Sequence, residues 1–160
     1  MKKYLTSFFV IGLLTGLANA QQTNFSGNWI EPELEMLAGI RYSNAVPKGI
    51  TVTQTKDSIK IMSLEVDDNN FTQTIALNGE TALRIGKTSK RTIRTKANWS
   101  NNGRTLTIVT TYGYVDNPDK AEYTNIEVWN LSLDGNLVIE KTSDADVTDD
   151  WIIKATYSKG

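Results

Sequence analysis

Apolar and polar residues alternate along most of this chain with a period of two, the spacing of a β-strand with one buried face. The alternating segments are short and rich in Thr, Ile, Val, Tyr and Trp, which favour strands. Turn residues separate them. We therefore predict ten strands, at Phe25–Ile30, Ile50–Thr55, Ile59–Glu65, Phe71–Leu77, Leu83–Lys87, Arg91–Trp99, Arg104–Tyr114, Glu122–Leu131, Leu137–Ser143 and Trp151–Ser158.

The clearest pair of strands flanks Asn102-Gly103. Asn-Gly between alternating apolar residues is a strong hairpin signal, because both residue types tolerate the positive φ that a tight turn needs. A two-residue loop places Trp99 opposite Leu106 and Arg91 opposite Tyr114. One face of this hairpin is then apolar and aromatic, so we expect it to point inward.

A second hairpin surrounds Asp134-Gly135, and its register has two alternatives. A two-residue loop would place Trp129 opposite Glu140. A three-residue loop with Gly135 in the left-handed conformation places like residues opposite each other and opposite charges together, so we favour it. The pairs that it predicts are Leu131–Leu137, Trp129–Ile139 and Glu127–Lys141.

The connections between the strands alternate in length, which indicates an up-and-down meander with its turns at two opposite ends. Short turns are predicted at 56–57, 78–79, 102–103 and 134–135, and longer connections at 31–48, 66–70, 88–90, 115–121 and 144–150. A sheet with this many strands tends to curl and close, which removes its unpaired edges. We predict an all-β, antiparallel meander closed into a barrel of 8–10 strands.

The longest connection, 31–48, has helical features at its start. Pro32 suits the first position of a helix, and Glu33 and Glu35 suit its N-terminal turn. Three apolar residues would share one face of this helix, namely Leu34, Leu37 and Ala38. We predict a short helical lid after the first strand.

Residues 1–20 have the pattern of a secretory signal peptide. Lys2-Lys3 supplies a charged start, Phe8–Leu14 an apolar run too short for a comfortable membrane anchor, and Ala18–Ala20 a small-residue cleavage site. No Cys follows, so the chain is not expected to be a lipoprotein. We predict a bacterial protein exported to the periplasm or medium, with a single domain over 21–160.

The composition excludes several chemistries. The sequence contains no Cys and no His, which removes disulfides, thiol nucleophiles, His-based triads and His-based zinc sites. Without residues 1–20 the chain has 15 basic and 18 acidic residues, a net charge of −3 that does not suit nucleic acid. We predict no enzymatic activity and no cofactor.

The segment 144–150 carries four aspartates, a composition that hard cations prefer. It lacks the glycine and the distant glutamate of an EF-hand loop. We therefore interpret it as a solvated acidic loop and predict no metal site.

The stretch Phe25-Ser-Gly-Asn-Trp29 resembles the F-x-G-x-W opening of the calycin barrels, which are the lipocalins and the intracellular fatty-acid-binding proteins. Trp99–Ile108 and Glu127–Gly135 are similar to units of small secreted bacterial lipocalin-like proteins. The resemblance implies a barrel that holds a small molecule. Fatty-acid-binding proteins usually end in Arg-x-Tyr, which holds a ligand carboxylate. Here Tyr157 is present, but Ala155 stands in the place of the Arg.

The predicted registers place a set of polar and aromatic residues inside the barrel, where a charge is costly unless it is paired. The candidate ligand-binding residues are Arg91, Tyr112, Tyr114, Tyr123, Glu127, Trp129, Lys141 and Tyr157. Glu127–Lys141 either orients a polar ligand group or forms a cross-strand pair whose tips reach water. Large residues are expected to plug the tight-turn end of the barrel, namely Trp99, Leu106, Leu131 and Leu137.

Two functions fit this arrangement. The first is a non-enzymatic carrier of a small hydrophobic or amphipathic molecule. The second is a protein-interaction module, such as an inhibitor or envelope accessory, with a filled barrel and long loops that make contact. A cavity of about 300 Å³ or more favours the carrier, and a barrel without one favours the interaction module.

Overall fold

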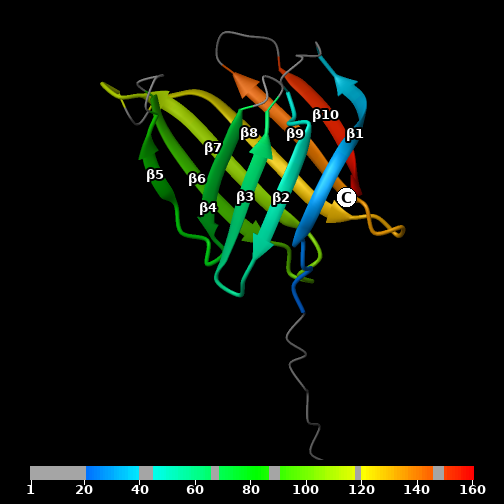
Figure 1. The fold of residues 1–160 in the computed structure, drawn as a ribbon. Coiled ribbons are helices and arrows are strands. Elements are labelled where there is room, and N and C mark those ends of the chain that lie inside the picture. Colours follow the sequence, from blue (N-terminus) through cyan, green and yellow to red (C-terminus); the bar gives the residue numbers. More distant parts are fainter. Residues whose placement is uncertain (1–20, 40–44, 66–68, 87–90, 118–119, 146–149) are drawn as a thin grey trace, which may run out of the picture.

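The computed structural model of the protein describes residues 21–39, 45–65, 69–86, 91–117, 120–145 and 150–160. The predicted signal peptide lies outside these residues. The described part is an all-β, antiparallel meander, curved until it is nearly closed into a barrel (Figure 1). Its ten strands are β1 (Gly27–Ala38), β2 (Gly49–Gln54), β3 (Ser58–Leu64), β4 (Asn70–Ala76), β5 (Ala82–Ile85), β6 (Arg91–Trp99), β7 (Leu106–Tyr114), β8 (Ala121–Leu131), β9 (Leu137–Ala145) and β10 (Trp151–Lys159).

The strands lie in the order β4-β3-β2-β1-β10-β9-β8-β7-β6-β5, so the first and last strands are neighbours. β4 and β5 are consecutive in the chain, yet they are the two edges of the sheet. β5 has only four residues, all of them exposed. Across this seam, the guanidinium carbon of Arg84 lies 5.0 Å from the centroid of the Phe71 ring.

Both predicted hairpin registers are confirmed. β6 and β7 pair from Trp99–Leu106 to Arg91–Tyr114, and β8 and β9 pair as the three-residue loop requires, with Glu127 opposite Lys141. Gly135 has φ +80°, and its N–H donates to the carbonyl of Ser132 at 3.0 Å. The β2–β3, β4–β5 and β6–β7 turns lie along the lower side of Figure 1, and the β8–β9 turn projects at its right.

The predicted helical lid is wrong. β1 continues through residues 31–38 as a strand paired with β10, and there is no helix among the described residues. The physical reason is an alternation of period two: Leu34 and Met36 pack against the core, while Glu33 and Glu35 are exposed on the other face. Pairing with β10 also satisfies the backbone, which outweighs the weak helical signals.

A β-bulge accommodates Pro32 in this strand. The register of β1 against β10 shifts between Ile30 and Glu33, where Pro32, which has no N–H, interrupts the ladder. Glu31 adopts φ +50° at the same place. The rest of the predicted lid includes residues 40–44, which lie outside the described residues.

The tight-turn end of the barrel is closed by the segment that precedes β1. The N–H of Thr23 donates to the carbonyl of Gly103 at 2.8 Å, which ties this segment to the β6–β7 turn. The ring of Phe25 is fully buried, stacked on Trp99 at 5.8 Å and edge-on to Trp129 at 5.9 Å. These aromatic residues form the floor of the barrel.

The four residues expected to plug this end have different positions. Leu106 and Leu137 are fully buried, and Trp99 packs against the core, as expected. Leu131 is 36% exposed and does not plug the barrel. Phe25 fills that end instead.

Within the described residues, no helix has the length and apolar character that a membrane span requires.

Candidate functional site

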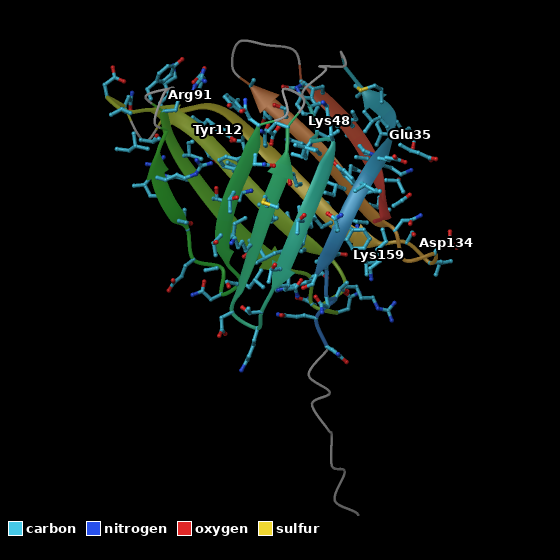
Figure 2. The ribbon with its side chains drawn as sticks, viewed as in Figure 1. Glu35, Lys48, Arg91, Tyr112, Asp134 and Lys159 are labelled. Atoms are coloured by element: carbon cyan, nitrogen blue, oxygen red, sulfur yellow. The ribbon has the colours of Figure 1, made fainter. Side chains whose placement is uncertain are left out.

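Above the floor lies a cavity of about 610 Å³, lined by residues of β2 to β10 and by Ala45–Pro47. Most of the predicted site residues line it, namely Arg91, Tyr112, Tyr123, Glu127, Trp129, Lys141 and Tyr157. Tyr114 does not line the cavity and is 44% exposed. Figure 2 shows Arg91 and Tyr112 near the upper end of the barrel, on the side of β6 and β7.

Cross-strand pairing arranges the inner face of β6 to β9 in rows. Nearest the long-loop end is the mouth row, which consists of Ile93, Tyr112, Tyr123 and Ala145. Below it lies the middle row of Thr95, Thr110, Asn125 and Ser143, followed by the ion-pair row of Ala97, Ile108, Glu127 and Lys141. The floor row consists of Trp99, Leu106, Trp129 and Ile139. The cavity wall thus changes from aromatic to hydroxyl and amide, then to charged, and finally to apolar.

At the mouth, Arg91 forms a bidentate ion pair with Glu122. Its Nε and a terminal nitrogen donate to the two carboxylate oxygens at 2.6 and 2.5 Å. The hydrogen bonds raise the pKa of Arg91 and lower the pKa of Glu122. A β-bulge in β8, where Tyr112 opposes Tyr123 but Gly113 opposes Ala121, makes Glu122 the extra residue.

Beside this pair, Tyr112 and Tyr123 stack on each other with their ring centroids 4.3 Å apart. Burial raises the pKa of Tyr112 and raises the pKa of Tyr123 to about 12. Both phenols are therefore neutral at physiological pH. The guanidinium carbon of Arg91 lies 5.7 Å from the ring centroid of Tyr123, so the mouth of the cavity has an aromatic wall next to a neutralised cation.

The middle row supplies uncharged polar groups. Thr95 and Ser143 are buried, and the Oγ1 atoms of Thr95 and Thr110 lie 3.4 Å apart. Asn125 lies between Thr110 and Ser143 on the neighbouring strands. Its Oδ1 is buried and accepts no hydrogen bond from any described residue. A buried acceptor of this kind is unusual in a folded protein.

Below the middle row, Lys141 Nζ lies 3.4 Å from Glu127 Oε1. The other oxygen of Glu127 accepts a 3.1 Å hydrogen bond from Trp129 Nε1. The two charged side chains are 16% and 26% exposed, and both line the cavity. The pair therefore faces the interior of the barrel, where a ligand would lie, rather than the outer surface.

Tyr157 is buried, and its hydroxyl is bound to the backbone of the protein and not to an arginine-held carboxylate site. Its hydroxyl donates to the carbonyl of Pro47 at 2.9 Å, and burial raises its pKa above the usual range. Ala155 is fully buried. The described site therefore has no arginine-tyrosine pair at this end of the chain to hold a carboxylate.

Several lining residues were missed by the sequence analysis, including Ser63, Glu65, Phe71, Gln73, Arg84, Glu122, Asn125 and Trp151. The sequence analysis could have identified Asn125, because the confirmed registers place it between Thr110 and Ser143. Trp151 pairs with Ser143 and lines the cavity. Arg84 alternates with the exposed Leu83 and Ile85 in a strand too short for a clear periodicity.

The charges that line the cavity are balanced. Three are cationic, Arg84, Arg91 and Lys141, and three are acidic, Glu65, Glu122 and Glu127.

Within the described residues, no group of three or more His, Cys, Asp or Glu side chains is placed to hold a metal ion. Residues 146–149 of the predicted acidic loop lie outside that part. The arrangement can bury apolar surface and form hydrogen bonds to neutral polar groups.

Comparison of the chain with models of known protein families finds no match, and comparison with curated proteins finds none. The resemblance to lipocalins and fatty-acid-binding proteins therefore stays a prediction.

Proposed function

We propose that this protein is an exported, non-enzymatic carrier that holds a small hydrophobic or amphipathic molecule inside its barrel. The observation that supports this most strongly is the cavity of about 610 Å³. Its volume lies within the range of about 300–1,000 Å³ that is typical of small-molecule sites. Trp129, whose ring packs edge-on against Phe25 of the floor, lines the cavity.

The lining also suits a ligand with two kinds of surface. Ile50, Ile61 and Ile139 offer apolar contacts, and the hydroxyls, amides and paired charges of the middle and ion-pair rows offer hydrogen bonds. Pockets for small molecules usually combine apolar walls with a few placed polar groups. The alternative function, an interaction module, was predicted to have a filled barrel, and a cavity of this size favours the carrier.

The test is native mass spectrometry of residues 21–160, purified from the periplasm or medium of the expressing cells, followed by solvent extraction. We expect a co-purifying small molecule, or binding of at least one member of a panel of long-chain alcohols, fatty acids, retinoids and haem. A clean apo mass that no member of the panel changes would overturn the proposal.

A matched pair of variants tests whether the cavity is the binding site. Ser143→Phe places a large ring on the inner face of β9, and Thr142→Phe places the same ring on the outer face of the same strand. The inner variant should lose most of the binding, and the outer variant should keep it. Circular dichroism checks that both are folded. Equal binding by the two variants would place the site elsewhere.

A further inference from the structure

One cation of the cavity wall has no acidic partner, and it bears on the chemical class of the ligand; this inference rests on the proposed carrier function. Arg91 and Lys141 belong to the two ion pairs described above. Arg84 of β5 also lines the cavity, but it forms no ion pair with any residue that the structure describes. Its guanidinium lies over the ring of Phe71, across the seam between β4 and β5, and an aromatic face supplies no full counter-charge.

Arg84 lies in the same row of the barrel as Tyr112. It is opposite Ile93 on β6, and Ile93 is opposite Tyr112 on β7, so Arg84 continues the mouth row onto β5. The backbones of β5 and β7 are therefore about 10 Å apart, a gap that two long side chains can span together with a small ligand group. Burial raises the pKa of Tyr112, and the positive charge of Arg84 opposes this rise.

The hydroxyl of Tyr112 is a second donor without an acceptor. It makes no hydrogen bond within the described part of the chain. The polar side-chain atoms that are both unpartnered there and inaccessible belong to Thr92, Trp99 and Asn125, so the Tyr112 hydroxyl can be reached from the cavity that it lines. A protonated phenol and a guanidinium both donate, and a carboxylate accepts several hydrogen bonds at once.

We infer that the ligand carries an acidic group, which Arg84 and the hydroxyl of Tyr112 hold at the mouth of the cavity. Arg84 is exposed as well as cavity-lining, so the acid stays partly hydrated there and loses less solvation than it would deeper in the barrel. The apolar part of the ligand then extends toward Ile61 and Trp129. This site is distinct from Tyr157 on β10, whose hydroxyl already donates to a backbone carbonyl.

Three probes with the same ten-carbon chain test the ligand class: decanoate, 1-decanol and decylammonium. Their affinities for residues 21–160 are measured at pH 7.5 by isothermal titration calorimetry. We expect decanoate to bind at least ten-fold more tightly than decylammonium, because an unpaired cation attracts the first and repels the second. Decylammonium that binds as tightly as decanoate, or decanol that binds where decanoate does not, would overturn the inference and leave the carrier function standing. If none of the three binds and the wider panel also fails, the carrier function falls together with the inference.

Variants of Arg84 separate its role from the general affinity of the cavity for an alkyl chain. Arg84→Met keeps the length of the side chain and removes its charge, so decanoate should bind about 5- to 20-fold more weakly, the loss of a charge-assisted hydrogen bond at a partly exposed site. Decanol affinity should not change. Arg104→Met makes the same change of net charge at an exposed position of the β6–β7 turn and should leave every affinity unchanged. Arg84→Lys restores the charge and should recover part of the decanoate affinity.

Tyr112→Phe tests the second donor, because it removes the hydroxyl and keeps the ring that stacks on Tyr123. Decanoate should bind about 3- to 10-fold more weakly, and Tyr114→Phe, on the same strand but outside the cavity lining, should have no effect. Circular dichroism checks that each variant is folded, and Arg84→Gln is a second uncharged variant in case methionine perturbs the seam. If either uncharged variant of Arg84 is folded and binds decanoate as tightly as the wild-type protein does, Arg84 does not hold the acid, and the inference is wrong.

Discussion

Replacing Phe25 by alanine tests the idea that the aromatic floor holds the barrel closed. The ring of Phe25 is fully buried and contacts Trp99 and Trp129. The two hydrogen bonds of this residue come from its backbone: its N–H donates to Gln54 Oε1 at 3.0 Å, and its carbonyl accepts from Trp29 Nε1 at 2.9 Å. The substitution keeps both bonds, so the measured effect belongs to the ring.

Truncation of a buried Phe to Ala typically costs about 3–5 kcal/mol, which combines the lost burial and the void that remains. With a urea m-value of about 2 kcal/mol/M, a loss of about 4 kcal/mol lowers the unfolding midpoint by about 2 M. For a domain of about 140 residues, the melting temperature should fall by about 10–15 °C. Phe25→Leu keeps most of the apolar volume and loses two ring contacts, so it should cost about 1–3 kcal/mol.

The assay is equilibrium urea unfolding followed by circular dichroism, with Leu133→Ala as the matched control. Leu133 is a large apolar residue that is fully exposed at the β8–β9 turn, and its truncation should change the free energy of unfolding by less than about 0.5 kcal/mol. If Phe25→Ala costs no more than about 1 kcal/mol, the floor is not held by this ring, and our explanation of how the tight-turn end closes is wrong.

Three further predictions concern charge and backbone. Pairing lowers the pKa of Glu122, so its contribution is present above its unfolded pKa near 4.5 and is lost as the pH falls through the lower folded value. Glu122→Gln should therefore cost about 1 kcal/mol at pH 7, since Arg91 is partly exposed, and this cost should shrink as the pH falls below about 4.5; a pH-independent difference in urea unfolding would refute this. Lys141→Met should destabilise the protein by about 2 kcal/mol, because it leaves Glu127 partly buried without its partner. Adding Glu127→Gln should recover about half of that loss in a double-mutant cycle, whereas strict additivity would show that the two charges do not interact. Gly135→Ala should cost about 1 kcal/mol through backbone strain at φ +80°, with no steric clash, because an added Cβ meets no atom within 4 Å. An unchanged melting temperature would mean that the turn relaxes.

The sequence was informative where local signals and burial agree. Gly135 marks a turn that needs a positive φ, and the alternation on both sides then leaves a single register for β8 and β9. The same logic gave the register of β6 and β7, and with it the inward direction of Tyr112 and Lys141. Because these registers place side chains in rows, much of the cavity wall followed from them.

The failures have physical causes that a single sequence does not reveal. Residues 31–38 have both a weak helical pattern and a period-two pattern, and pairing with β10, distant in sequence, decides between them. Glu122 was missed because a bulge in β8 changes the alternation at that residue. Tyr114 lies on the predicted face of β7, but at the end of the strand, where it is exposed.

The pairing of β1 with β10 has a consequence for how the chain folds. Trp29 lies opposite Lys159, about 130 positions further along the chain, and the N–H of Gly160 donates to the carbonyl of Asn28. Contacts between such distant positions are slow to form, because the loop between them must close first. During synthesis, β1 therefore pairs with β10 only after the intervening strands β2 to β9 have been made. The barrel is therefore completed only when β10 takes its place between β1 and β9.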